Sequence, residues 1–151
     1  MAEKDKAGLN RDNAERNKAV VRRALDEIWN KGNLDYADEI CTPDCVIHSA
    51  PGGTIAATRN GGAKRFVAAN REAFPDLQLT IDDLIAEGDK VVARFRVSGT
   101  QKGFFMGNAP TDKRGEVWGL SIWQLEDGKI REGWGILDAM AVMGVLSAPD
   151  R

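Results

Sequence analysis

Acid–base chemistry in this chain would have to come from one histidine and a few well-placed carboxylates. His48 is the only histidine and ends the apolar stretch "CVIHSAP". Its imidazole can titrate near neutral pH. Asp138 directly precedes the apolar run "AMAVMGVL". We take His48 and Asp138 as candidate catalytic residues. Each has a structural alternative, a hydrogen-bonded histidine in the first case and a helix N-cap in the second.

A metal or nucleotide site is not expected. Cys41, Cys45 and His48 lie close in sequence, but Pro43 interrupts any helical register and a structural zinc site needs four ligands. The sequence contains no G-x-G-x-x-G motif, no P-loop and no nucleophile elbow. We therefore predict neither a metal ion nor a cofactor.

Length and composition restrict the class of protein. The 151 residues favour one domain, and we assign residues 13–151 to it, with residues 1–12 as a polar, frayed tail. A formal net charge of −2 gives no reason to expect nucleic acid. The first twenty residues lack the apolar stretch of a secretory signal, and no run reaches the ~20 apolar residues of a membrane span. We expect a cytoplasmic protein with reduced thiols.

The first half of the chain is predicted to be mainly helical. Apolar residues recur at helical spacing between residues 10 and 33, and a short second helix covers residues 34–41. "CVIHSA" is typical of a short strand, and residues 53–62 of a loop. A third helix over residues 63–74 should end at Phe74-Pro75-Asp76, because proline cannot continue it.

The second half alternates apolar and polar residues, as strands do. Strands are predicted near residues 77–88, 90–100, 116–126 and 129–137, with Asp127-Gly128 as a hairpin turn and a short final helix after Asp138. Helices followed by an antiparallel sheet indicate an α+β fold. Strand 116–126 is apolar on both faces, so we expect a homodimer packed through its sheets.

The order and spacing of "AFPDL", "IAEGDKVVARFRVSGTQKGFFMGNAPTDKRGE" and "EDGKIREGWGILD" resemble those of SnoaL-like polyketide cyclases in the nuclear-transport-factor-2-like superfamily. "VRRALDEIWNKGNLDYADEICTPDCVIHSAP" looks like the opening helices and first strand of that family. The resemblance implies a cone-shaped, strongly curved antiparallel sheet. Three helices from the N-terminal half would pack on its concave face, and a short helix would follow at the C-terminus. It also implies an apolar pocket and frequent dimerisation.

The resemblance also implies where the pocket lies. It places odd-numbered residues of strand 129–137 inward, so Glu132 would be a solvated or interface charge and Trp134 an interface residue. The oily tip "FFM" of the 97–119 connection would cap the pocket mouth, contact a neighbouring subunit or simply plug the core. The expected lining residues are Trp29, Phe74, Phe95, Phe104, Met106, Ser121, Trp123 and Gly135.

Known cyclases of this family close a ring by intramolecular aldol condensation, without metal or cofactor. Their general acid/base is an Asp whose position matches Gly135 here, and a helper His matches Ser121. Two functions therefore stay open. One is a cofactor-independent cyclase or isomerase that acts on an apolar, oxygenated, polyketide-like molecule. The other is a non-catalytic small-molecule-binding or oligomerisation module of the same fold.

Overall fold

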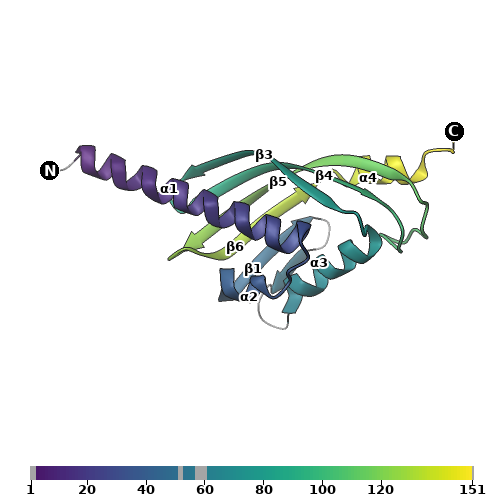
Figure 1. The fold of residues 1–151 in the computed structure, drawn as a ribbon, viewed down its shortest axis with the longest axis horizontal. Helices are drawn as coiled ribbons and strands as arrows, with labels where there is room; N and C mark the ends of the chain where they lie inside the picture. Colours follow the sequence, from purple (N-terminus) through teal and green to yellow (C-terminus); the bar gives the residue numbers. More distant parts are fainter. Residues whose placement is uncertain (1–2, 51–52, 57–60, 151) are drawn as a thin grey trace.

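A six-stranded sheet forms the body of the molecule in a computed structural model that describes residues 3–50, 53–56 and 61–150 (Figure 1). The strand order is β2-β1-β6-β5-β4-β3. Together with helices that gather on one side, this sheet confirms the predicted α+β class. The strands are β1 Cys41–Ala50, β2 Gly53–Ala56, β3 Gln78–Glu87, β4 Lys90–Thr100, β5 Arg114–Glu126 and β6 Lys129–Leu137.

Two features of the sheet differ from the sequence-based expectation. The pair β1–β6 is parallel, whereas the other neighbouring pairs are antiparallel, because β1 lies between its successor β2 and the last strand β6, which runs in the same direction. Residues 53–56 were expected in a loop but form β2, whose backbone pairs with β1 from Val46↔Ala56 to Ser49↔Gly53. Alternation of side chains indicates neither the direction nor the partner of a strand.

The helices are α1 Glu3–Leu25, which continues as a wider π-helical turn Asp26–Asn30, then α2 Tyr36–Ile40, α3 Gly62–Ala73 and α4 Ala139–Ser147. Helix α3 ends directly before Phe74, as predicted. Helix α1 begins well before the predicted boundary, so residues 3–12 are helical rather than a frayed tail, and Figure 1 shows this end of α1 projecting beyond the sheet. No described helix is long and apolar enough to cross a membrane.

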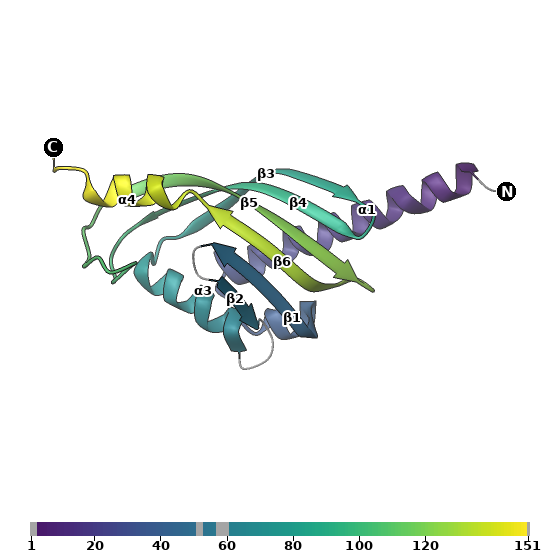
Figure 2. The same cartoon turned by 180° about the vertical axis from the view of Figure 1, so that it is seen from behind.

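The core lies between the helices and one face of the sheet. Figure 2, the view from behind, shows β6, β1 and β2 on the near side with α1 passing behind them. Val21 of α1 and Val91 of β4 are fully buried, and both belong to one continuous apolar cluster. Removing such side chains from water is the main favourable term that holds helix and sheet together.

The opposite face of β5 is apolar and largely uncovered in the single chain. Trp118, Leu120 and Ile122 are 53%, 37% and 40% exposed, and Ile136 of β6, the partner of Leu120, is 56% exposed. We call these four residues the outer patch. The expectation that both faces of this strand are apolar is therefore met, with one face under the helices and the other open.

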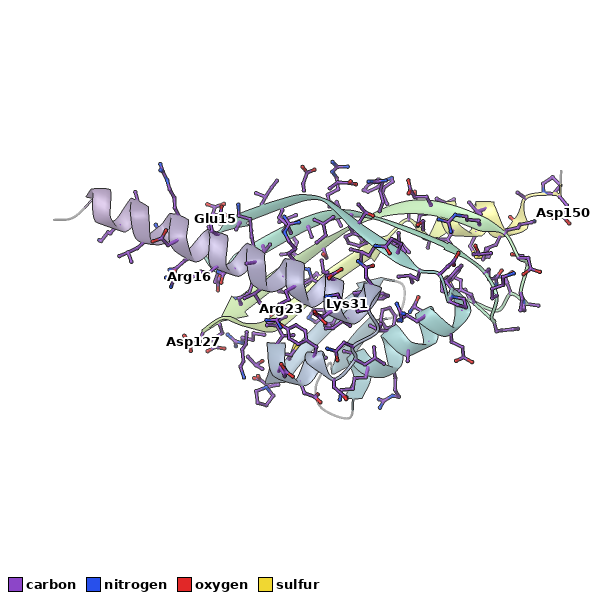
Figure 3. All side chains as sticks on the ribbon, viewed as in Figure 1. Glu15, Arg16, Arg23, Lys31, Asp127 and Asp150 are labelled. Atoms are coloured by element: carbon purple, nitrogen blue, oxygen red, sulfur yellow. The ribbon has the colours of Figure 1, made fainter. Side chains whose placement is uncertain are left out.

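The β5–β6 hairpin closes with the predicted tight turn. Asp127 and Gly128 both have positive φ, +49° and +76°, and Glu126 pairs with Lys129 across the turn. Two central residues with positive φ are the mark of a type I′ turn, whose twist matches that of the strands. Figure 3 labels Asp127 at this tip, far from the C-terminal Asp150.

A single amide side chain fastens the end of the first helical segment to the edge of the sheet. Asn30 Nδ2 donates to the Leu79 carbonyl at 3.0 Å, and the Leu79 backbone N–H donates to Asn30 Oδ1 at 2.7 Å. Asn30 also donates to Asp26 at 3.1 Å. Since β3 is an edge strand, this amide completes backbone hydrogen bonds that a further strand would otherwise make.

We expect Asn30→Ala to lower the free energy of unfolding by about 1–3 kcal/mol, because Leu79 is buried and would lose both partners. Asn33→Ala is the matched control. Its side chain makes one exposed contact of 3.3 Å with Glu27, so the change should stay within about 0.5 kcal/mol. Urea denaturation followed by circular dichroism measures both. If both changes lowered the free energy of unfolding equally, the stabilising role of the Asn30–Leu79 hydrogen bonds would be contradicted.

Candidate functional site

An apolar cavity of about 420 Å³ lies between the helices and the concave face of the sheet. Its walls come from all four helices and the π-helical turn after α1, from the strands β1, β3, β4, β5 and β6, and from the connection between β4 and β5. Most lining side chains are aliphatic or aromatic. The side chains that bring a polar or sulfur atom are Trp29, Cys41, Ser49, Asn70, Ser98, Met106, Lys113, Ser121 and Trp123.

Most of the lining residues expected from the sequence surround this cavity. They are Trp29, Phe74, Phe95, Met106, Ser121, Trp123 and Gly135. Phe104 does not line it and is 69% exposed. The neighbouring Phe105 lines the cavity instead and packs edge-to-face on Phe74 with ring centroids 4.9 Å apart.

Trp123 forms one wall by lying flat against a glycine of the next strand. It pairs with Gly133 across β5–β6, and a Cβ built on Gly133 would lie 2.5 Å from the Trp123 ring. The indole Nε1 donates to Ser121 Oγ at 2.8 Å. Ser121 is 4% exposed, so this hydrogen bond satisfies a polar group that would otherwise be costly to bury.

Gly135 leaves an open space opposite Ser121. The two residues are direct partners across β5–β6, and both line the cavity. A Cβ built on Gly135 would meet no atom within 4 Å, in contrast to Gly133 on the same face. Gly135 is therefore not required for close packing, and its missing side chain enlarges the cavity.

The oily connection between β4 and β5 contains its own tight turn. Phe105 and Asn108 exchange backbone hydrogen bonds of 3.0 and 2.8 Å, while Met106 and Gly107 between them have φ of +46° and +82°. This geometry turns Phe105 toward the cavity and leaves Phe104 outside.

The start of the same connection is attached to the end of α3. The backbone N–H groups of Lys102 and Gly103 both donate to the Ala73 carbonyl, which fixes the connection there.

A buried glutamine holds the same connection from within. The Gln101 side chain is fully buried, donates to the carbonyls of Gly103 and Asn108, and accepts from the Thr111 hydroxyl at 2.8 Å. Every polar atom of its amide group is thus used. This residue escaped the sequence analysis because a glutamine in a Gly-rich connection gives no periodic signal.

His48 lies on the other face of the sheet from the cavity. Its neighbours Ile47 and Ser49 line the cavity, whereas His48 Nε2 lies 2.8 Å from Glu132 Oε1 and its ring stacks on Trp134 with centroids 5.4 Å apart. The parallel register pairs His48 with Trp134, so both project outward. The geometry favours the structural alternative, a hydrogen-bonded histidine beside the outer patch.

Asp138 caps the last helix. Its side chain accepts from the Ala141 backbone N–H at 2.9 Å, which satisfies one of the unpaired donors at the start of α4. Its neighbours Leu137 and Ala139 line the cavity, but Asp138 does not. The two candidate catalytic residues are therefore brought neither to the cavity nor to each other.

The titratable side chains among the cavity's lining residues are Cys41 and Lys113. Lys113 Nζ donates to the carbonyls of Leu146 and Ala148 and lies 3.7 Å from Asp150, so it is engaged at the end of α4. Cys41 accepts a hydrogen bond from the Cys45 thiol, and this bond lowers the pKa of Cys41. In the described part of the chain, no three His, Cys, Asp or Glu side chains gather as metal ligands would.

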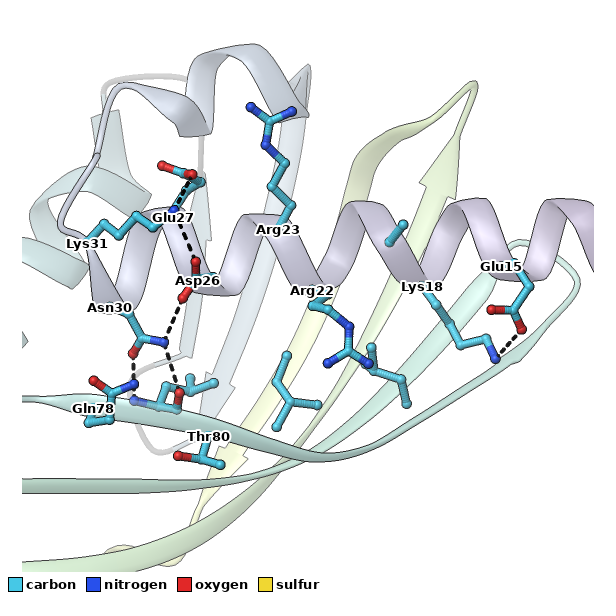
Figure 4. Close-up of a pocket in the computed structure, with 14 residues that line it drawn as sticks. Glu15, Lys18, Arg22, Arg23, Asp26, Glu27, Asn30, Lys31, Gln78 and Thr80 are labelled. Carbon is cyan, nitrogen blue, oxygen red and sulfur yellow. Dashed lines mark hydrogen bonds and ion pairs between the residues drawn. The ribbon is translucent and has the colours of Figure 1, made fainter.

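A second, open groove of about 850 Å³ runs between α1 and β3 (Figure 4). Its charges largely neutralise each other, since Lys18 pairs with Glu15 at 2.7 Å and Lys31 pairs with Glu27 at 2.8 Å. The Lys31 contact and the Asn33 amide lower the pKa of Glu27. A groove of paired surface charges offers a small molecule little, so the apolar cavity is the candidate site.

Comparisons with known proteins agree with this geometry. Residues 19–145 match the family model described as SnoaL-like polyketide cyclase. Many solved structures are similar in fold, and three of them serve as examples. A provisionally assigned SnoaL-like polyketide cyclase from Jannaschia sp. CCS1 is 30% identical, with a TM-score of 0.82 over 90% of this chain and 94% of that one. No curated protein matches significantly.

The other two come from Streptomyces. AclR of Streptomyces galilaeus, provisionally a hydroxylase, is 29% identical with a TM-score of 0.76 over 90% of this chain and 98% of its own. IdmH of Streptomyces antibioticus, provisionally a polyketide cyclase, is 28% identical with a TM-score of 0.74 over 87% and 99%.

The two glycines on the inner face of β6, Gly133 under the Trp123 ring and Gly135 at the cavity, give a matched test of this wall. We expect Gly133→Ala to destabilise the protein by about 1–3 kcal/mol, because the new methyl group collides with the Trp123 ring. Gly135→Ala should leave stability equal or slightly higher, since its methyl group enters open space and restricts the unfolded chain. Thermal melts followed by tryptophan fluorescence distinguish them. A reversed order would contradict the packing described.

Proposed function

This chain belongs to the SnoaL-like polyketide cyclase family, and from that premise we propose that it binds an apolar, oxygenated, ring-bearing molecule in the cavity. The observation that carries the proposal is the cavity itself. Its volume of about 420 Å³ falls within the range of small-molecule sites, and its walls are largely apolar with a few polar groups. Such a site favours a molecule with fused rings and few oxygens.

The Ser121–Trp123 pair is the best candidate to recognise a ligand oxygen. Ser121 Oγ accepts from the indole, which leaves its own hydroxyl hydrogen to donate to a carbonyl inside the cavity. The open space at Gly135 lies directly across from it. A ring edge that carries a ketone or ester would fill that space and meet the hydroxyl.

A second candidate function is cofactor-independent cyclase or isomerase chemistry. It is favoured by the position of Ser121 and Gly135, which face each other at the cavity where the resemblance puts the acid–base pair of the known cyclases. Neither residue can carry a proton between substrate atoms as a carboxylate and an imidazole do. Binding therefore has better support than an intramolecular aldol reaction, and we expect no ring closure on anthracycline-type methyl esters.

We also propose that two copies of this chain pair through the outer patch. The patch is flanked by ion pairs, Arg94–Asp83 at 2.6 Å and Arg96–Asp82 at 2.9 Å. The Arg96 hydrogen bonds lower the pKa of Asp82. An apolar centre with a charged border is the usual composition of an interface.

Ligand binding is tested by titrating the native protein with a polycyclic aromatic ketone while following tryptophan fluorescence. We expect a saturable response, much of which Trp123→Phe removes because that ring lines the cavity. Trp134→Phe is the control, since its ring lies on the outer face against His48, and it should keep the response. Loss of the response in the control alone would place the ligand outside the cavity. Chromatography of the same mixture should return the ketone unchanged.

Pairing is tested by light scattering at micromolar concentration. We expect a native mass near twice the 16.5 kDa of one chain, and dissociation in Trp118→Glu, which buries a charge at the centre of the patch. Leu9→Glu also adds a charge at an exposed apolar residue, but on α1 away from the outer face, and it should remain paired. A single-chain mass for the native protein would refute the proposal.

A further inference from the structure

The two cysteines lie side by side although they are four residues apart on a strand. Cys41 pairs with Ile130, and the next paired residue on β1 is Val46, opposite Glu132. Five steps along β1 thus match two steps along β6, so the chain bulges between them. Residues 41 and 45 of a regular strand would be about 13 Å apart, whereas the bulge brings the two thiols into hydrogen-bond contact.

The two thiols differ in their access to the cavity and in the direction in which their pKa is shifted. Both thiols are buried, but Cys41 lines the apolar cavity and is 6% exposed, while Cys45 does not line it and is 1% exposed. The hydrogen bond from Cys45 lowers the pKa of Cys41, against smaller opposing effects of burial and Asp38. The same hydrogen bond raises the pKa of Cys45, and burial, Asp44 and Glu132 act in the same direction. The Cys41 thiol therefore lies at the cavity, and the Cys45 thiol, which does not line the cavity, donates a hydrogen bond to it.

We propose that Cys41 is a covalent modification site in the cavity wall that reacts with apolar α,β-unsaturated carbonyl compounds. Apolar walls select such molecules over charged ones, and the cavity holds their ring against the sulfur. Cys45 is a positioning residue, because it donates to the sulfur that attacks. The proposal rests on the proposed function, because it needs the same accessible cavity. It does not require that the protein turn over a substrate.

The reaction is a conjugate addition and balances without an oxidant. The Cys41 thiol gives its proton to water, and the sulfur lone pair forms a bond to the β-carbon of the enone. The π pair of the C=C bond moves to give an enolate, which then takes a proton from water at the α-carbon. The net change is addition of S–H across the double bond. A thiolate is the reactive species, so a hydrogen bond that stabilises it raises the rate near neutral pH.

The experiment uses the native full chain with N-cyclohexylmaleimide as an apolar probe and 6-maleimidohexanoate as a charged one with the same reactive ring. We expect one N-cyclohexylmaleimide adduct by intact mass, mapped to Cys41 by peptide sequencing, and at least tenfold slower labelling by the charged maleimide. The saturated analogue N-cyclohexylsuccinimide should slow maleimide labelling by competing for the cavity. Labelling of Cys45, equal labelling of both thiols, or no labelling would overturn the proposal.

Cys45→Ala tests the supporting thiol. Losing the donated hydrogen bond should shift the pH–rate profile of Cys41 labelling to higher pH and slow the labelling at pH 7.5. An unchanged profile in a variant that melts like the native protein would show that Cys45 has no such role. The ketone titration on the native protein separates the two proposals. Ketone binding without labelling refutes only this inference, while absence of both refutes the proposed function too.

Discussion

The contact between the Trp123 ring and the backbone of Gly133 decides what the concave face can hold. A side chain at residue 133 would push the ring away, since even a Cβ would lie 2.5 Å from it. With glycine there, the ring lies flat, its N–H reaches Ser121 at 2.8 Å, and the space opposite Ser121 at Gly135 stays empty. At Gly135, strand β6 therefore leaves open space on its inner face, whereas protein interiors are in general closely packed with side chains.

Much of the fold follows from the sequence, and what failed has a physical cause. The bounds of β4 and β6, the end of α3 before Phe74 and the Asp138 cap agree with the predictions, because alternation, proline and N-cap chemistry are local signals. The early start of α1 was missed because Leu9 is the single large apolar residue among residues 3–12, and one residue forms no apolar stripe to indicate a helix. The parallel β1–β6 pair and β2 were missed because pairing partners are set by tertiary structure.

For the candidate site, too, some residues could be placed from the sequence and others could not. Trp123, Ser121 and Gly135 line the cavity. The period of two along a strand indicates which residues share a face, and the resemblance to the family indicated which face is the inner one. His48 could not be placed like this, because the bulge between Cys41 and Val46 interrupts the period just before it. Phe105 rather than Phe104 faces inward because Met106 adopts a left-handed conformation, which no sequence pattern at a methionine indicates.

The two faces of β6 differ in character: one carries charged and aromatic side chains, and the other carries glycines. The outer face carries Glu132 and Trp134, which hold His48, and the inner face carries Gly133 and Gly135. A carboxylate at residue 135 would stand in an apolar wall, where desolvation disfavours its charged form and raises its pKa toward the range useful for proton transfer. Glycine removes both that desolvation cost and the proton carrier. Glycine at residue 135 therefore provides no acid–base group but gives the cavity more volume and apolar contact. This favours binding of a ring system over its rearrangement. The thiol of Cys41, the proposed site of modification, lies in the lining of the same cavity.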